Sequence, residues 1–480
     1  MPLKTDILII GGGLSAYAAA YEIVKNSTLN VTILAPGGGA SPYIHGFCLP
    51  VGEGDSQELF YEDTVNSGYG VGDQKLIKRL CKDSLQLPQW FAELGLTVDE
   101  KMIKSLGSSV ARIAGIGNNT GPVVMQAIHK RLPEDRVTWY NYRALKLLKE
   151  NGRVVGARCY RKDTDSFENI YAGGVILATG GFGRLFPEST NSADIGGDGC
   201  AMASLAGCSL RDMEFIQFEP SAAIWPPQLS GKSIITTMFY EGAVLRGGDG
   251  KRFMDEKVGK DVQAKAIAAQ IMAGNTTPHG GLWFDATAVP EQLWETVYKP
   301  YLDRYLKYDI DMRKEPVEIA PAAHTTCGGV VIDEDCRTEV PGLIACGEVT
   351  GGLHGANRLG GNAGLEVMVF GRIAGKTAIA EFKDISLEAE NTKKNTPRDV
   401  GALRTRLQLL LRQNLGVLRI EEHMQKALAE VEQLCDFLRD HEDSYDAWRL
   451  YNDAVTAKYA FESAIARKNS LGCHEVKEHG

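Results

Sequence analysis

Short apolar runs that end in glycine open the chain and recur along it. Asp6–Ile10 is such a run, Gly11–Gly13 follows it, and Leu14–Lys25 is rich in alanine. Buried parallel strands are near-continuous apolar runs, and alanine favours helix. With a second apolar run at Asn30–Leu34, the pattern predicts a strand–helix–strand unit within about 35 residues.

Later segments repeat this alternation over most of the chain. Apolar runs bounded by turn residues predict strands, and helical spacing predicts the elements between them. The predicted strands lie at 137–148, 153–160, 171–179 and 342–346, and the predicted helices at 74–105, 119–132, 198–206 and 363–382. Alternating strands and helices favour the α/β fold class.

Two stretches depart from this pattern. Between residues 222 and 322, Pro, Trp and Tyr are frequent and the segments are short, which indicates an inserted domain. Residues 386–398 are polar and linker-like, and apolar residues then follow helical spacing to about Ser470. The predicted boundaries are 1–222 and 323–385 for the α/β domain, 223–322 for the insertion and 398–480 for a helical domain.

Composition narrows the function classes. The formal charge of −9 over 480 residues argues against a nucleic-acid partner, which would need a basic face. Ten cysteines lie scattered without CxxC spacing, so we expect no metal or iron–sulfur site and a cytoplasmic setting with reduced thiols. The first apolar run is too short for a signal peptide, and no stretch of about 18 apolar residues predicts a membrane span.

The first glycine-rich turn has the spacing of a dinucleotide site. In Gly11-x-Gly13-x-x-Ala16, the first glycine permits a tight turn and the second lets backbone approach a pyrophosphate. The helix N-terminus that follows supplies amide donors and a positive dipole end. Ala35 stands where a nicotinamide dinucleotide site has an acidic residue for the ribose, which argues against NAD.

Three further segments favour FAD. Val175–Gly181 is a strand that ends in glycines, and Gly197–Gly199 precedes a helix of small residues. Gly342–Glu348 ends a strand with an acid that can bind a ribose or ribitol hydroxyl. All three occur in the order that an extended FAD site requires.

These segments also carry a family resemblance. The run Glu348–Asn362, EVTGGLHGANRLGGN, resembles the signature of the fumarate reductase/succinate dehydrogenase flavoprotein family, which includes L-aspartate oxidase and flavocytochrome fumarate reductases. Ala323–Val330, Phe215–Pro220 and Gln413–Arg419 resemble other parts of that family. The resemblance covers nearly the whole chain. It implies a Rossmann-type FAD-binding domain with an inserted α+β capping domain and a C-terminal helical domain.

The resemblance also implies where FAD binds. Ser41 is followed by Pro42 in place of the histidine that carries covalent FAD in respiratory members, so we expect non-covalent FAD. The helix that begins near Asn362 is expected to point its positive N-terminus at the flavin. The expected cofactor-binding residues are Gly11, Gly13, Leu14, Ser15, Ala16, Ala35, Ser41, Gly180, Gly181, Asp198, Glu348, Asn362, Ala363 and Leu365.

Two residues match the family's substrate site. Arg358, in the HGANR run, matches an arginine that clamps a substrate carboxylate, and His324 matches a carboxylate-binding histidine. A guanidinium suits this role because its planar fork binds a carboxylate through two hydrogen bonds. Such cations also stabilise the negative charge that the transition state gathers.

Other positions depart from the family pattern. Glu219 stands where the family has a second carboxylate-binding histidine, and Lys260 stands where it has a proton-donating arginine. Glu241 matches the acid of the family's proton relay, and Arg246 is the candidate for its second arginine. Tyr240 replaces the threonine before that acid. Lysine can donate a proton in place of arginine when burial or nearby cations lower its pKa.

Three functions remain open on these residues. An acid beside a bound carboxylate costs several kcal/mol if both stay charged and dry, so Glu219 argues against fumarate and for a small substrate with one carboxylate. The first hypothesis is an enzyme that reduces an activated C=C bond or runs the reverse dehydrogenation. The second is an amino- or hydroxy-acid oxidase. The third is an electron-transfer subunit with a degenerate pocket that works with an iron–sulfur or other partner, through which the chain could associate with a membrane.

Overall fold

The computed structural model describes residues 3–117, 119–385 and 393–477. Its largest sheet has the strand order β5-β2-β1-β8-β7-β6, with β15 also paired to β8. These strands are β1 (Leu3–Ile10), β2 (Val31–Leu34), β5 (Val137–Tyr140), β6 (Tyr142–Glu150), β7 (Arg153–Arg161), β8 (Ser166–Leu177) and β15 (Leu343–Ala345). The pairs β5-β2, β2-β1, β1-β8 and β8-β15 are parallel, whereas β8-β7-β6 is an antiparallel meander.

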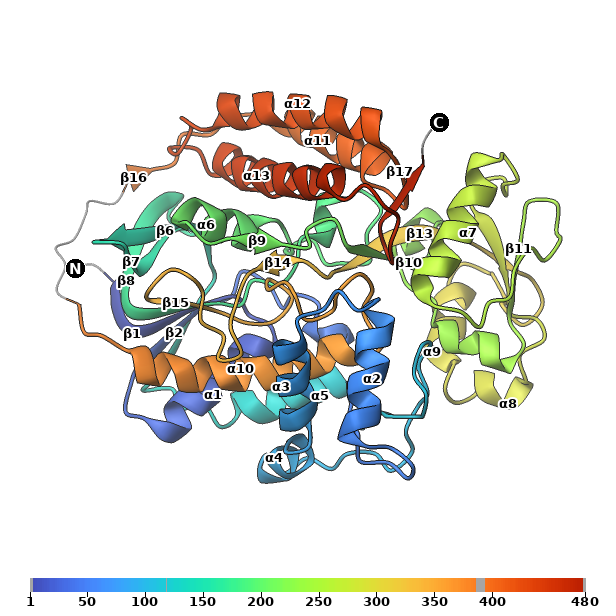
Figure 1. Ribbon diagram of the computed structural model, residues 1–480, viewed down its shortest axis with the longest axis horizontal. Helices are drawn as coiled ribbons and strands as arrows, with labels where there is room; N and C mark the ends of the chain where they lie inside the picture. The colour runs from blue at the N-terminus through green and yellow to red at the C-terminus, as the bar shows by residue number, and fades with distance from the viewer. Residues whose placement is uncertain (1–2, 118, 386–392, 478–480) are drawn as a thin grey trace.

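Helices α1 (Leu14–Asn26) and α10 (Asn362–Glu381) pack together beneath the sheet, with α5 (Thr120–His129) beside them (Figure 1). Glycines in α10 allow this close approach. A Cβ added at Gly371 would lie 2.6 Å from the carbonyl oxygen of Ser15, and one at Gly375 would lie 2.5 Å from that of Ala19. The core strand β1 is buried over Ile7–Ile10 as a result.

A second domain is inserted between the two halves of the first. Its sheet has the order β10-β13-β12-β11, and its core is separate from that of the first domain. The strands are β10 (Ile216–Ala223), β11 (Val244–Arg246), β12 (Leu282–Asp285) and β13 (Val317–Thr326), and the helices are α7 (Lys260–Met272), α8 (Glu291–Trp294) and α9 (Lys299–Leu306). Figure 1 shows it to one side of the main sheet, in green and yellow.

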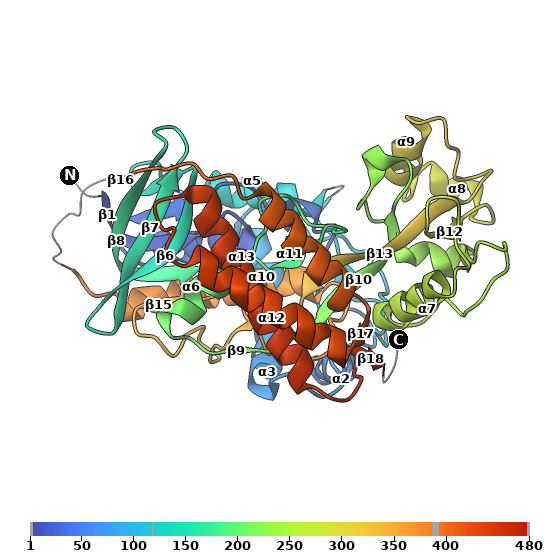
Figure 2. The ribbon, with the colours of Figure 1, turned by 90° about the horizontal axis from the view of Figure 1, so that it is seen from above.

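Three C-terminal helices cover the face of the sheet opposite α10 (Figures 1 and 2). They are α11 (Gly401–Asn414), α12 (Glu421–Leu438) and α13 (Tyr445–Ala466). Helix α13 packs on α6 (Asp198–Ala206), where Thr456 Oγ1 donates to the carbonyl of Gly197 at 2.7 Å. The remaining helices, α2 (Gln57–Ser67), α3 (Gln74–Ser84) and α4 (Leu87–Glu93), flank α10.

This architecture confirms the predicted α/β class with a helical C-terminal domain. The continuous helix predicted over 74–105 is wrong. This segment instead forms two helices, α3 and α4. Helix α4 ends at Glu93 because Gly95, shortly after it, adopts a left-handed conformation with φ of 71°. The predicted linker 386–398 falls mostly outside the described residues. Among the described helices, none is both long and apolar enough to cross a bilayer.

Candidate active site

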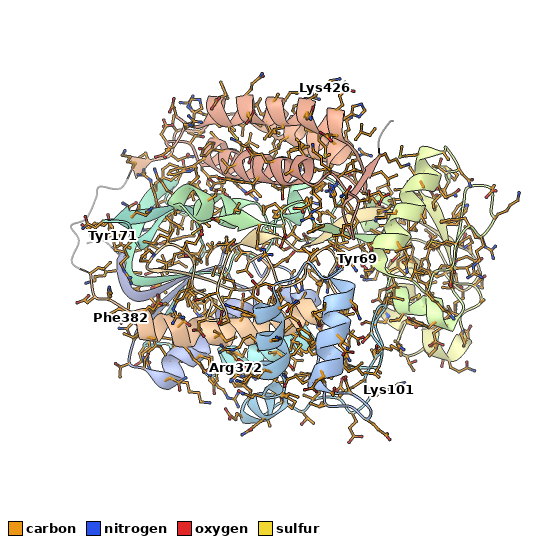
Figure 3. All side chains as sticks on the ribbon, in the orientation of Figure 1. Tyr69, Lys101, Tyr171, Arg372, Phe382 and Lys426 are labelled. Atoms are coloured by element: carbon orange, nitrogen blue, oxygen red, sulfur yellow. The ribbon has the colours of Figure 1, made fainter. Side chains whose placement is uncertain are left out.

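A cavity of about 820 Å³ extends from the turn after β1 to the boundary between the first domain and the inserted domain, which we call the capping domain. Residues from the glycine-rich turn, from the end of β8, from the loop before α10 and from the capping domain line it. Tyr69, which also lines it, lies near that domain boundary in Figure 3. A lining that reaches from the turn after β1 to the domain boundary suits an extended ligand with a second, smaller molecule at one end.

In the turn after β1, the backbone of Gly11 lies close to the backbone of Ala178, just after the end of β8. Gly11 has φ of 128°, and an added Cβ would overlap the carbonyl oxygen of Ala178. Helix α1 then begins at Leu14, whose amide donates to Ser41 Oγ at 2.8 Å. Gly13 and Ser15 line the cavity at this helix N-terminus, where free amides and the helix dipole favour a phosphate.

Most of the expected cofactor residues line this cavity. They are Gly11, Gly13, Ser15, Ser41, Gly180, Asp198, Glu348 and Ala363. The others lie behind this lining and are Leu14, Ala16, Ala35, Gly181, Asn362 and Leu365. Leu14, Ala16, Asn362 and Leu365 are fully buried because their helix positions face the core. An added Cβ at Gly181 would meet the Glu348 carboxylate, so its role is to let that acid approach.

Unpaired polar atoms mark where a ligand is needed. Thr179 Oγ1 and Asp198 Oδ1 are buried without a hydrogen-bond partner among the described residues. The other oxygen of Asp198 accepts from Arg143 at 2.7 Å. Glu348 accepts from the amide of Thr326 at 3.0 Å, and burial raises the pKa of its carboxyl group. Buried polar groups are almost always hydrogen-bonded, so this lining fits the hydroxyl-rich body of FAD.

A buried ion pair stands where the capping domain closes the cavity. Lys260 Nζ, on the first residue of α7, lies 2.5 Å from Glu219 Oε2 on β10. Ser221 donates to the other carboxylate oxygen at 3.0 Å. Burial raises the pKa of Glu219, but the positive charge of Lys260 and the bond to it outweigh burial, so the pKa lies below its usual value. Glu219 is therefore held as a carboxylate.

Arg358 lies beside this pair in the loop before α10. Its Nη2 donates to Gln217 Oε1 at 3.0 Å, and Gln217 in turn donates to the carbonyl of Arg358 and to Asn357 Oδ1. The Arg358 Nε is buried with no hydrogen-bond partner in the described part of the chain. Gln217 thus fixes one side of the guanidinium, and the Nε–H donor is left unpaired among the described residues.

His324 joins Lys260, Glu219 and Arg358 at the cavity because strand β13 contains a β-bulge at this residue. Gln217 pairs with Thr325 and Phe218 with Ala323, so His324 is the extra residue of a β-bulge in β13. Bulges re-aim side chains, and His324 lines the cavity with its Nδ1 2.7 Å from Thr190 Oγ1. Burial, followed by the charge of Lys260, lowers its pKa to about 3. The imidazole is consequently neutral near neutral pH.

The predicted relay residues lie outside the cavity. Tyr240 is 39% exposed and Glu241 is also exposed, at the end of the 3-10 helix Thr236–Glu241. Arg246 lies on β11 and pairs with Asp285 at 2.8 Å. The expectation that these three residues reach the site is therefore corrected. The first residues of the same helix, Thr236 and Thr237, line the cavity instead.

Several lining residues were missed from the sequence. Arg304 and Tyr301 reach the cavity from α9, and Arg304 donates to the carbonyl of Ser233 at 2.9 Å. Tyr69 donates to Asp261 at 2.6 Å across the domain boundary. These residues lie in segments without a motif, so only the tertiary structure brings them to the site.

A Rossmann-type turn, an extended cavity and a capped pocket with a fixed guanidinium define a flavin-dependent oxidoreductase. A family model described as FAD binding domain matches residues 6–363. A subunit of the fumarate reductase (CoM/CoB) of Methanothermobacter marburgensis is 31% identical over 98% of this chain and 94% of its own. An L-aspartate oxidase of Caulobacter vibrioides is 32% identical over 97% of this chain and 92% of its own.

The fold agrees with a solved relative. The FrdA chain of Escherichia coli quinol fumarate reductase, in a variant form, superposes with a TM-score of 0.88 at 24% identity and covers 100% of this chain and 92% of that chain. The chain thus belongs to the FAD-dependent oxidoreductase family of fumarate reductase and succinate dehydrogenase flavoproteins. FAD is its cofactor, and the resemblance stated from the sequence is confirmed.

Substitution of Gly11 by alanine tests the cofactor turn. We expect G11A to retain less than about a tenth of the wild-type FAD, since the left-handed φ and the overlap with Ala178 displace the turn. Flavin absorbance per protein after desalting measures this, with far-UV circular dichroism to show folding. In the matched variant G38A, the added Cβ meets only Pro42 at 3.5 Å, so normal FAD content is expected. A G11A variant with the FAD content of the wild type would show that this turn does not contribute to the cofactor site.

Proposed function

We propose that this flavoprotein transfers a hydride between FAD and a carbon–carbon bond of a small substrate with one carboxylate. The observation that supports this most is the buried Arg358 Nε without a partner among the described residues, in a cavity that Lys260 also lines. A donor held ready at a fixed guanidinium suits a carboxylate, which accepts two parallel bonds. The ammonium alongside suits the proton that must accompany the hydride.

Each residue of the pocket has a separate task in this proposal. Bound FAD supplies the hydride chemistry. Arg358 binds and orients the carboxylate, while the neutral His324 adds an uncharged polar contact. Lys260 holds or releases a proton at Nζ, and Glu219 keeps that ammonium in place and balances its charge. The capping domain excludes water, which strengthens these interactions.

The charge of the pocket disfavours fumarate. Glu219 and Lys260 form a pair that is neutral as a unit, so this side of the pocket provides no net cation for a second carboxylate. His324 is neutral near neutral pH, so it does not supply a cation for a second carboxylate either. The other cations that the capping domain contributes to the lining are Lys232 and Arg304, and the Nη1 of Arg304 donates to the carbonyl of Ser233. A second acidic group would have to reach one of these two.

A substrate panel tests this proposal. Under anaerobic conditions, reoxidation of reduced enzyme by fumarate, crotonate and other enoates is compared with reduction of oxidised enzyme by amino and hydroxy acids. We expect a monocarboxylate enoate to react at least about tenfold faster than fumarate, the factor that about 1.4 kcal/mol provides. Robust fumarate reduction would overturn the proposed substrate class but leave the flavoprotein assignment intact.

A second candidate is the oxidation of an amino or hydroxy acid. The neutral imidazole of His324 supports it, because such an imidazole can accept a proton from a substrate amine or hydroxyl. The similarity to an L-aspartate oxidase is in line with this interpretation. Rapid formation of hydrogen peroxide in air with an amino or hydroxy acid would favour it over C=C reduction.

We also propose an electron-transfer partner and non-covalent FAD. The relative from Methanothermobacter marburgensis is named as one subunit of its enzyme, which supports a partner protein with an iron–sulfur or other redox centre for this chain. Such a partner would also be the route to any membrane association. Pro42 follows Ser41 at the position discussed for covalent attachment, which supports a dissociable cofactor.

A further inference from the structure

The segment after helix α13 returns to the domain boundary and ends in strand β18 (Glu475–Lys477). It pairs in parallel with β17 (Leu418–Ile420), the strand between α11 and α12. His474 within it is fully buried and accepts from the guanidinium of Arg419 at 2.7 Å through Nδ1. Arg419 Nη1 also donates to the carbonyl of Glu214 at 2.8 Å. We call residues 471–477 the tail segment.

On one side the tail segment contacts the loop that carries Arg358. The amide of Cys473 donates to the carbonyl of Ala356 at 2.8 Å, and Cys473 Sγ lies 3.6 Å from Asn357 Oδ1. Asn357 Oδ1 is the atom that also accepts from Gln217 at 2.7 Å. Gln217 in turn binds the Arg358 guanidinium. The tail segment is therefore connected to the proposed carboxylate clamp by three hydrogen bonds through two intervening residues, Asn357 and Gln217.

On its other side the tail segment contacts the capping domain. Glu475 forms an ion pair with Lys265 at 2.8 Å, and both side chains are only about a quarter exposed. Lys265 lies on α7, whose first residue is Lys260. Figures 1 and 2 both show β17, the partner strand of β18, next to α7, and Figure 2 labels β18 beside it. The same short segment thus contacts the supports of Arg358 and of Lys260.

We infer that the tail segment positions the two halves of the substrate pocket relative to each other. Cys473 and Glu475 are positioning residues, which act through the Ala356–Arg358 loop and through α7. This inference rests on the proposed function, in which Arg358 and Lys260 serve one substrate. Because Arg358 belongs to the FAD-binding domain and Lys260 to the capping domain, their separation depends on the contact between these domains. The Glu475–Lys265 pair fixes that contact from outside the cavity.

Charge reversal across this ion pair tests the inference in the FAD-loaded enzyme. The variants are E475K, K265E and the double swap K265E/E475K, with K468E as the matched control. Lys468 pairs with Glu421 at 2.6 Å within the helical domain, and among the described residues no hydrogen bond or ion pair joins it to either support. Two readouts are used: hydrogen–deuterium exchange of residues 354–362 and 258–264, and the Kd of crotonate from the change in flavin absorbance.

We expect either single reversal to speed amide exchange in both segments and to raise the crotonate Kd about threefold to tenfold, and the double swap to restore both. K468E should match the wild type in both readouts. Unchanged exchange in both single variants, or a double swap that restores neither readout, would overturn the positioning role. If crotonate does not bind the wild type, the proposed substrate class fails, and the exchange data still decide the role of the tail segment.

Discussion

Replacement of Arg358 by leucine is expected to lower kcat/KM for the carboxylate substrate about 10³-fold, which corresponds to about 4 kcal/mol of lost transition-state binding. Arg358 is 8% exposed and its guanidinium is held by Gln217, so the leucine variant loses a donor that is already oriented toward the substrate site. The side chain also balances the substrate charge in a buried site. Its removal leaves the carboxylate without a partner.

Anaerobic turnover with the best substrate of the panel measures this effect, with FAD content recorded for each variant. R358K should recover part of the loss, since an ammonium keeps the charge but not the planar fork. R406L is the matched control, because Arg406 binds Glu430 on the exposed helical domain at 2.6 Å. A wild-type kcat/KM in R358L would mean that the substrate carboxylate binds elsewhere.

Replacement of Lys260 by methionine is expected to lower kcat about 10²- to 10⁴-fold, the usual contribution of a positioned acid or base. Methionine keeps much of the side-chain volume but cannot carry a proton. The change also leaves Glu219 as a buried carboxylate without its cation, so the pKa of Glu219 should rise. Double replacement K260M/E219Q removes that unpaired charge and separates the proton function from the pairing.

The kcat of K260M and its dependence on pH are measured against K257M. Lys257 is an exposed lysine near the ring of Tyr240, at 5.7 Å, and serves as the matched control. We expect K257M to keep the wild-type profile. If K260M/E219Q turns over at the wild-type rate, the proton comes from another group. If only K260M is slow, the role of Lys260 is to neutralise Glu219.

Local signals in the sequence were sufficient to predict the cofactor-binding turns and the helices that follow them. At the turn of Gly11 and Gly13, and in the segment from β15 to Glu348, the same residues meet a requirement of the fold and a requirement of cofactor binding. Positive φ, close backbone approach and a helix N-terminus all depend on residues within a few positions of one another. For that reason the predicted helix starts at 14, 198 and 362 or 363 agree closely with α1, α6 and α10.

The capping domain could not be predicted to the same depth. Its site residues come from segments that meet only in three dimensions, as the pairing of Glu219 with Lys260 shows. From the sequence, Glu219 and Lys260 were predicted to face the substrate as two separate charged groups. In the structure they form an ion pair with each other. Tyr240, Glu241 and Arg246 were assigned by spacing in a short irregular segment, where one residue of register decides whether a side chain faces the cavity.

The ribbon formed by β10 and β13 has a consequence for exchanging parts between relatives. It runs from one domain into the other as two hydrogen-bonded strands, and it carries Glu219 and His324 along its length. A chimaera that grafts a foreign cap at residues 223 and 317 would cut one strand at its end and the other at its start. The ribbon would then keep the Glu219 and His324 of the host, while the residues at 260 and 304 would come from the foreign cap. Transfer of substrate preference therefore calls for a graft that spans 216–326 as one piece.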